Sequence, residues 1–343
     1  VWRNIGPNNI GGRIFALALN PLRPQTMFAG AADGGVWRSY DGGQTWESVS
    51  DDWPTQAMGS IAINPVDTSV IYAATGDASF GGQSFDGAGV MKSTDGGATW
   101  AELQGDSLPR YIRASDIAIN PVDPDILFLA IPYGNFDPAL GGIWRTRDGG
   151  ASWELVLTGR MTDIVINPMD PDILYTVSSK VIGGLTADRY GLHKTTDGGD
   201  SWFPVDIGVP DSLMGRTAIG ICAEQPDVLY LGVSEVTGAG RTPLLGVFKT
   251  TNAGADWEHL TVPFDYLVPQ GWFDNIIGVH PSNPDIVYAG GVKLIRSSDG
   301  GRTWERIADQ LAGGILHVDQ HEIEFDPFDP DRVYVGNDGG LFL

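Results

Sequence analysis

Ser297-Ser298-Asp299-Gly300-Gly301-Arg302-Thr303-Trp304 decides the fold, because the chain contains this phrase six times. The pattern Ser/Thr-x-Asp-Gly-Gly-x-Thr/Ser-Trp recurs at residues 39–46, 93–100, 146–153 and 195–202, and in a diverged form at 250–257. A short carboxylate accepts hydrogen bonds from the backbone N–H groups just ahead of it, and glycines supply the positive φ of a tight turn. We therefore predict a hairpin at each copy, fastened by a structural residue: Asp41, Asp95, Asp148, Asp197, Asn252 and Asp299.

The spacing of these six residues indicates a propeller. They are 47 to 55 residues apart, which is the length of one four-stranded blade. A second phrase, built on Ile-x-Ile-Asn-Pro, occurs seven times, first at residues 17–21 and last, in a weaker form, at 323–327. Each copy predicts a short strand that ends in a proline-rich turn. The sequence therefore predicts an all-β, seven-bladed β-propeller of four-stranded antiparallel blades.

The seventh unit has three expected strands instead of four. Residues 315–343 supply these three, and residues 1–6 resemble a fourth strand, with Trp2 in the place of Trp46. We expect one propeller over residues 1–343, whose last blade combines 315–343 with the strand 1–6 and so leaves no exposed edge. The alternative is a natural chain that continues past Leu343 with its own seventh phrase.

The strand order assigns the loops to two faces. Both repeated phrases fall on one face, which we interpret as structural. The connections between the second and third strands fall on the other face, and they are long in four blades, at residues 76–89, 132–142, 178–191 and 234–246. Irregular loops on a rigid scaffold commonly carry binding sites. Aromatic residues near this face can stack on sugars or pack the loops together: Trp53, Phe80, Phe85, Tyr133, Phe136, Tyr190 and Trp272.

Composition limits the classes of partner. The formal net charge of -22 argues against nucleic acid and anionic membranes, which both require a basic surface. No apolar segment is long enough to insert into a membrane. The single cysteine, Cys222, excludes an internal disulfide.

The two repeated phrases together resemble the Asp-box (BNR-repeat) propellers of the superfamily of family-74 glycoside hydrolases (xyloglucanases) and sortilin-type proteins. The resemblance covers essentially the whole chain. It implies a location that is extracellular, periplasmic or at the cell surface. Bacterial secreted proteins of this superfamily carry phrases like Gly271-Trp272-Phe273-Asp274 and His317-Val318-Asp319-Gln320-His321.

The resemblance also suggests catalytic carboxylates. Family-74 enzymes use an aspartate in a Thr-Asp-Ile-Gly-Gly-like segment, and Ala32-Asp33-Gly34-Gly35 is the nearest match, although it is one residue shorter. Their second catalytic aspartate comes from a second propeller, which these residues do not include. Asp338 occupies the equivalent turn in the adjacent blade 7, so Asp33 and Asp338 are our candidate acid and base for a glycosidic bond. The alternative is that an Asp-Gly-Gly turn needs its aspartate for its own geometry.

Arginines gather at one level near the start of the innermost strands. Arg13, Arg113 and Arg160 share that level, and Arg216 is one step off. They predict either a site for anions or carboxylates at the mouth of the channel, or pairing with aspartates of the same chain. We place Trp272 and Asp274 in the same ligand-binding region.

His317, Asp319 and His321 alternate, so in an extended strand all three side chains point the same way. Such a set can bind a divalent transition metal, and a hydrogen-bonded cluster without metal is the alternative. No other cofactor is expected.

Two functions follow from these patterns. The first is a propeller that binds, and in one version hydrolyses, a polysaccharide or oligosaccharide at its long-loop face. The alternative is a non-catalytic propeller that binds a protein or serves as a structural surface component.

Overall fold

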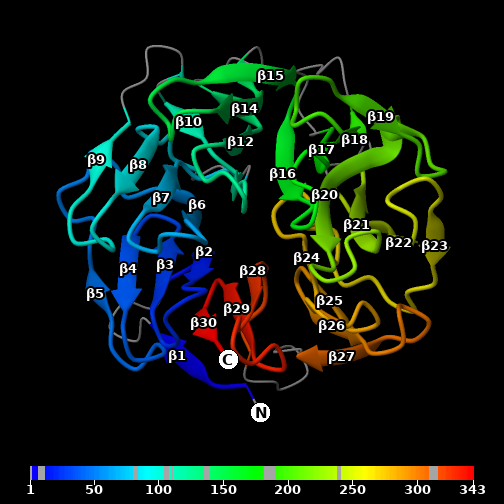
Figure 1. Cartoon of the computed structure of the whole chain (residues 1–343). Coiled ribbons are helices and arrows are strands. Elements are labelled where there is room, and N and C mark those ends of the chain that lie inside the picture. Colours follow the sequence, from blue (N-terminus) through cyan, green and yellow to red (C-terminus); the bar gives the residue numbers. More distant parts are fainter. Residues whose placement is uncertain are drawn as a thin grey trace.

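The computed structural model describes residues 2–6, 12–79, 84–103, 108–109, 111–134, 140–180, 190–237, 241–308 and 316–343. Its strands form seven four-stranded antiparallel sheets arranged as a ring around a central axis (Figure 1). The predicted seven-bladed propeller is therefore confirmed. In each blade the first strand is innermost.

The blades follow one another along the chain. Blades 1 and 2 comprise β2 (Ile14–Leu19), β3 (Met27–Ala31), β4 (Gly35–Ser39), β5 (Glu47–Ser48), β6 (Met58–Ile63), β7 (Ile71–Thr75), β8 (Val90–Ser93) and β9 (Ala101–Glu102). Blades 3 and 4 comprise β11 (Asp116–Ile119), β12 (Leu127–Ile131), β14 (Gly142–Thr146), β15 (Glu154–Thr158), β16 (Met161–Ile166), β17 (Leu174–Ser178), β18 (Gly191–Thr195) and β19 (Phe203–Val205). Blades 5 and 6 comprise β20 (Met214–Ile221), β21 (Leu229–Glu235), β22 (Leu244–Thr250), β23 (Glu258–Leu260), β24 (Ile276–Val279), β25 (Val287–Gly290), β26 (Leu294–Ser297) and β27 (Glu305–Ala308).

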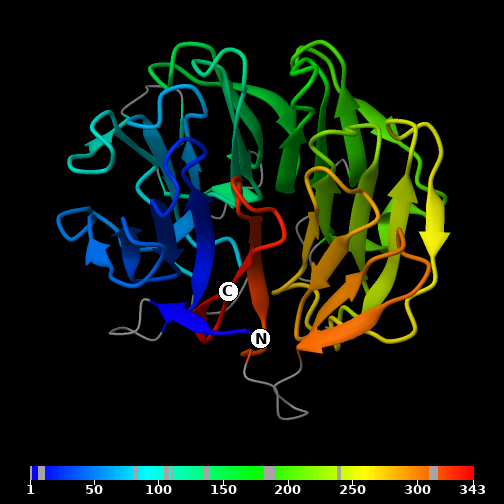
Figure 2. The same ribbon diagram turned by 60° about the horizontal axis from the view of Figure 1, so that its bottom comes forward.

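Blade 7 combines the two ends of the chain. It contains β28 (Gln320–Phe325), β29 (Val333–Asn337), β30 (Gly340–Phe342) and, as its outermost strand, β1 (Asn4–Gly6). The backbones of Arg3 and Leu343 exchange two hydrogen bonds, of 2.8 and 3.0 Å, and Figure 2 shows the two termini side by side. The prediction that the N-terminal strand completes the last blade is confirmed.

Two small elements lie outside the seven blades. Strands β10 (Ile112–Arg113) and β13 (Tyr133–Gly134) form a separate pair. A short 3-10 helix, η2 (Asp211–Leu213), precedes blade 5. No helix of the described residues has the length and apolar character needed to cross a membrane.

The repeated hairpin is fastened by its aspartate. Asp299 accepts hydrogen bonds from the backbone N–H of Thr303 at 2.9 Å and from its hydroxyl at 2.7 Å. Gly300 and Gly301 adopt φ of +74° and +88°, which explains why glycine is repeated there. The hydrogen bonds from Thr303 lower the pKa of Asp299 to about 2. In the diverged copy Asn252 Oδ1 still accepts the backbone N–H of Asp256 at 3.0 Å, but the bond between the two side chains is reversed, since the amide of Asn252 donates to the Asp256 carboxylate at 3.0 Å.

The cation just before the hairpin reaches into the next blade at five junctions. Lys92 Nζ donates to the carbonyl of Gly149 at 2.9 Å, and Lys194 Nζ to that of Ala253 at 2.8 Å. The same contact, between a cation and the hairpin carbonyl of the following blade, recurs at three more junctions: Arg38 to Gly96, Arg145 to Gly198 and Lys249 to Gly300. Five of the blade junctions are thus cross-linked by one repeated contact.

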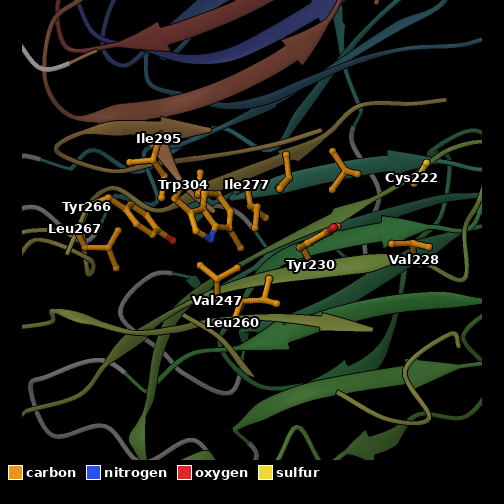
Figure 3. Packing of buried hydrophobic residues seen from close by; sticks show 14 residues of the cluster. Cys222, Val228, Tyr230, Val247, Leu260, Tyr266, Leu267, Ile277, Ile295 and Trp304 are labelled. Atoms are coloured by element: carbon orange, nitrogen blue, oxygen red, sulfur yellow. The ribbon is translucent and has the colours of Figure 1, made fainter. Parts of the chain in front are cut away.

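Apolar side chains fill the space between neighbouring blades. Figure 3 shows the cluster at the junction of blades 5 and 6, where Tyr230, Val247, Ile277 and Trp304 are labelled and all are at least 91% buried. Cys222 is a free, fully buried thiol at the edge of this cluster. Because each blade buries one face against the next, the core is a ring of such clusters.

Candidate functional site

Topology places the candidate residues on one face. In every blade the innermost strand runs from the long-loop face toward the face that carries the repeated hairpins. Residues just before an innermost strand, such as Arg13 and Asp274, and residues in the turn after a second strand, such as Asp33 and Asp338, therefore share the long-loop face. The hairpin aspartates lie on the opposite face. This is the division that the sequence predicted.

Arg13 and Asp338 meet across 325 residues of chain. Arg13 Nε donates to Asp338 Oδ1 at 2.7 Å, and its Nη2 approaches Oδ2 at 3.4 Å. His321 Nε2 lies 2.7 Å from Asp338 Oδ1. Burial acts to raise the pKa of Asp338, but the hydrogen bonds from His321 and Arg13 outweigh it, and the pKa lies below its ordinary value. Asp338 is therefore held as a carboxylate.

An aromatic clamp holds His321 in place. The rings of Phe15 and Phe273 meet the imidazole edge-on, with centroid distances of 4.4 and 4.9 Å. Arg13 lies over the Phe273 ring, with its guanidinium carbon 4.8 Å from the centroid. Burial lowers the pKa of His321 to about 4, so the imidazole is neutral at pH 7 and donates its Nε2 proton to Asp338.

Asp33 differs from Asp338 in its electrostatic surroundings. It is exposed at the tip of the turn between β3 and β4. Partial desolvation and the charge of Asp77 raise its pKa, and Arg13 opposes that rise. Arg13 thus acts on both members of the candidate pair. Of these two carboxyls, Asp33 has a raised pKa and Asp338 a lowered one.

The three predicted metal ligands do not form a metal site in this structure. Strand β28 begins only at Gln320, and Asp319 has φ of +63°, so the alternation expected of an extended strand fails across residues 317–321. His321 is engaged with Asp338, and the Nδ1 of His317 lies 3.1 Å from its neighbour's carbonyl, Val318 O. Among the described residues, no group of three or more histidine, cysteine or acidic side chains is arranged to hold a metal ion.

Asp274 and Asp319 form a second carboxyl pair beside this site. Asp274 is fully buried, and burial, followed by the nearby Asp319 charge, raises its pKa well above the ordinary value. Burial and the charge of Asp338 also raise the pKa of Asp319. Gln270 donates to Asp319 Oδ1 at 3.1 Å. Burial therefore disfavours the ionised form of Asp274, which lies beside Asp319 at this site.

The other predicted arginines also contact groups of their own chain. Arg113 Nε donates to Asp86 Oδ1 at 2.7 Å. Arg216 reaches from blade 5 to the carbonyl of Ala78 in blade 2, at 3.4 Å, and lies near the charges of Asp163, Asp274 and Asp77. Arg160 is 7% exposed. The partners of Arg13 and Arg113 are Asp338 and Asp86, so these two arginines pair with aspartates of their own chain, which was one of the two alternatives.

Below the mouth, a cavity of about 450 Å³ follows the axis. Four acidic side chains from blades 3, 4 and 7 line it: Asp116, Asp163, Glu322 and Glu324. Asp116 accepts from the backbone N–H of Ile117 at 2.7 Å and of Ile164 at 3.3 Å, so it ties blade 3 to blade 4. Burial raises the pKa of all four, that of Glu324 to about 8.

The aromatic residues divide between packing and exposure. Trp53 packs edge-on against Trp100, with a centroid distance of 5.0 Å, so it belongs to the junction of blades 1 and 2. Phe85 is 57% exposed, and Trp272 is half-buried against Phe273, with a centroid distance of 5.4 Å. Phe80 and Phe136 lie outside the described residues, as does the side chain of Tyr133.

Sequence reasoning missed the role of Phe15, Phe273 and Gln270. It offered two roles for His321, a metal ligand or a member of a hydrogen-bonded cluster, and the contact of the imidazole with Asp338 agrees with the second. The sequence did offer one indication of this site, the short turn shared by Asp33 and Asp338. Because blades 1 and 7 are adjacent and carry the same turn, side chains located between the two turns are expected to belong to one site.

Comparisons with known proteins agree with the resemblance expected from the repeated phrases. A xyloglucanase from a Paenibacillus species is 23% identical over 99% of this chain, and a xyloglucanase from Acetivibrio thermocellus is 27% identical over 89%. The chain spans 38% and 39% of the lengths of these two relatives. No protein-family model matches the chain.

Solved structures share the fold. A GH74 xyloglucanase from Xanthomonas campestris superposes with a TM-score of 0.70 at 21% identity, over 99% of this chain and 53% of that one. YCF48 from Cyanidioschyzon merolae superposes with a TM-score of 0.65 at 18% identity, over 99% of this chain and 98% of that one. At these identities the likeness concerns the fold alone.

Proposed function

We propose that this chain binds a xyloglucan-like polysaccharide at its long-loop face, in an extracellular, periplasmic or cell-surface location, and takes part in its hydrolysis. The xyloglucanases that match it over 89 to 99% of its length support the class of ligand. The proposal concerns residues 1–343, whatever further segments the natural protein has.

One observation carries the catalytic part of the proposal. Arg13 binds Asp338, and its charge also acts on Asp33, while the pKa values of these two carboxyls move in opposite directions, that of Asp33 upward and that of Asp338 downward. A general acid must hold a proton near neutral pH, and its partner must stay ionised. Desolvation moves the pKa of Asp33 in the direction that the first role needs, and the hydrogen bonds to Asp338 move its pKa in the direction that the second role needs.

In this proposal the two carboxyls, Asp33 and Asp338, have different roles in cleaving the glycosidic bond. Asp33 donates its proton to the glycosidic oxygen that leaves. Asp338 acts on the opposite side of the sugar, either on a water molecule or on the anomeric carbon itself, and the separation of the two carboxyls decides which. Arg13 and His321 fix the direction of the Asp338 oxygens through hydrogen bonds of 2.7 Å each.

Aromatic and acidic side chains around the pair complete the proposed ligand region. Trp272 and Phe85 can stack on sugar rings, since sugars present apolar C–H faces to aromatic surfaces. Arg113 is held by Asp86 in the loop that carries Phe85, so the arginine shapes this loop. Asp274 supports the region from within.

The test measures binding and hydrolysis separately. Xyloglucan binding by affinity electrophoresis and release of reducing ends should both be detectable with residues 1–343 or with the full natural chain. Asp33→Asn and Asp338→Asn should each lower hydrolysis by at least about a hundredfold and leave binding within a few-fold. Asp52→Asn, an exposed aspartate before blade 2, is the matched control and should change neither.

The outcomes separate the two functions. Binding without hydrolysis in the full chain would reject the catalytic roles of Asp33 and Asp338 and leave a glycan-binding propeller. An absence of binding to xyloglucan and to a panel of other polysaccharides would reject the glycan proposal and favour the alternative, a non-catalytic protein-binding propeller.

A further inference from the structure

The hairpin face exposes a band of apolar side chains that the proposed function does not use. The turn after the innermost strand presents one large apolar residue in each of five blades that follow one another around the closed ring, in the order 7, 1, 2, 3 and 4. These residues form what we call the apolar turn band: Phe328 at 51% exposure, Leu22 at 57%, Val66 at 63%, Val122 at 75% and Met169 at 65%. The corresponding positions of blades 5 and 6 hold the polar residues Glu224 and Ser282.

One local hydrogen bond sets all five side chains at the same position. The side-chain oxygen of the residue before the proline accepts the backbone N–H of the band residue, as Asn64 does from Val66 and Asn120 from Val122, both at 2.9 Å. The same contact holds Leu22, Met169 and Phe328 at 2.9 to 3.0 Å. The five residues therefore project from equivalent turns of the ring.

The band residues follow innermost strands that contact one another around the ring. Where the turns of blades 5 and 6 meet, the N–H of Glu224 donates to the carbonyl of Pro281 at 2.8 Å. The innermost strands β28, β2, β6, β11 and β16, which precede the band residues, contact one another in that order. Single exposed apolar residues are ordinary on a protein surface, but five on adjacent turns of one face indicate an interaction surface.

Acidic residues accompany the band. Seven exposed aspartates lie in the same turns, within three residues of Val66, Val122, Met169 or Phe328: Asp67, Asp123, Asp125, Asp170, Asp172, Asp329 and Asp331. The same turns contain two arginines, Arg23 and Arg332. A partner that fits this face must combine apolar side chains with basic ones.

We propose that the apolar turn band docks a basic, amphipathic segment of a partner protein. Burying the five side chains supplies an apolar contact, and the aspartates beside them pair with lysine or arginine of the partner. A second copy of this chain does not fit, because two faces with this charge, each in a molecule of net charge -22, would repel each other. An anionic lipid surface is disfavoured for the same reason.

The experiment uses a defined probe. A fluorescent helical peptide of about 18 residues, with leucine along one face and lysine along the other, is titrated with the protein at about 0.15 M salt. The triple variant Val66→Ser, Val122→Ser, Met169→Ser should weaken binding by at least about tenfold, because it removes three exposed apolar contacts. These side chains are largely solvent-exposed, so the variant should fold as the wild type does.

Two controls make the result specific. The triple variant Tyr111→Ser, Phe203→Ser, Leu213→Ser removes apolar residues of 58, 60 and 37% exposure elsewhere and should bind as the wild type does. A peptide with serine in place of leucine should bind more weakly than the amphipathic one. Equal binding by the two variants, or of the two peptides, would show attraction to net charge alone and overturn the proposal. A wild-type dimer in sedimentation velocity that the band variant loses would also overturn it, because a second copy would then cover the face.

Discussion

His321 shows how the surroundings of one side chain decide its chemistry. Its imidazole is 3% exposed and lies 2.7 Å from a carboxylate that Arg13 also binds. Phe15 and Phe273 close two sides of the ring. Burial lowers the pKa of His321 to about 4, so the residue acts as a neutral hydrogen-bond donor at pH 7 and positions Asp338.

This lowered pKa predicts a pH-dependent contribution to stability. The unfolded chain binds a proton at an ordinary histidine pKa of about 6.5, whereas the folded state binds it only near pH 4. The free energy of unfolding therefore falls as the pH falls from about 6.5 to 4, by up to roughly 3 kcal/mol from this residue. His321→Gln keeps an N–H donor but does not titrate. As the pH falls through that interval, the free energy of unfolding of His321→Gln should therefore rise relative to that of the wild type.

Urea denaturation of both proteins between pH 7 and pH 4.5 measures this difference. Asp116 and Glu324, whose raised pKa values act in the opposite direction, are present in both proteins, so their effect largely cancels. A constant difference across the interval would mean that His321 titrates normally in the folded state.

At the scale of the elements, the blades are joined by contacts that repeat with the sequence. Lys194 at the end of β18 lies over the Tyr175 ring, 5.2 Å from its centroid, and donates to Ala253 O in the next blade. The hydroxyl of Tyr175 donates to the same carbonyl at 2.8 Å. The cation before the hairpin is thus a connector between blades at five junctions.

Removing one connector should weaken one junction. Lys194→Met keeps most of the aliphatic side chain but loses the hydrogen bond and the cation–π contact, so we expect a loss of about 1 to 2 kcal/mol in the free energy of unfolding. Arg302→Met changes an exposed cation inside a hairpin and should cost less than about 0.5 kcal/mol. Equal losses in the two variants, measured by chemical denaturation, would contradict the connector role.

At the scale of the whole molecule, closure of the ring depends on a three-residue strand. Ile5 in β1 is 6% exposed and packs in the cluster that joins blade 7 to blade 1. Its carbonyl accepts the indole N–H of Trp46 at 2.9 Å. We propose that residues 1–343 behave as one cooperative unit because each blade buries a face against the next around a closed ring.

Ile5→Ala tests this closure. Shortening a buried isoleucine should lower the free energy of unfolding by about 2 to 4 kcal/mol, and calorimetry should still show one transition. Arg3→Ala, an exposed change in the same segment, serves as the control. A separate early transition in Ile5→Ala would show that blade 7 unfolds independently and that the ring is not one unit.

The fold could be predicted because the residue patterns that form its hairpins and strands are local and recur in each blade. Asp299, Gly300 and Gly301 form their hairpin with hydrogen bonds that span four residues, and the same chemistry recurs at each blade. The arrangement of His317, Asp319 and His321 was harder to predict. The alternation of their side chains assumed an extended backbone through residues 317–321, whereas Asp319 has a positive φ, which the residue pattern does not reveal.

The sequence by itself determined the number of blades, their boundaries, the two faces and the closing strand, since each follows from short-range turn chemistry and strand periodicity. Only the tertiary structure decided that Arg13, His321 and Asp338 meet, that Phe15 and Phe273 clamp the imidazole, and that the apolar turn band is exposed. The physical reason is that these arrangements depend on closing a ring between residues 325 positions apart, and on the burial that results, which no local pattern encodes.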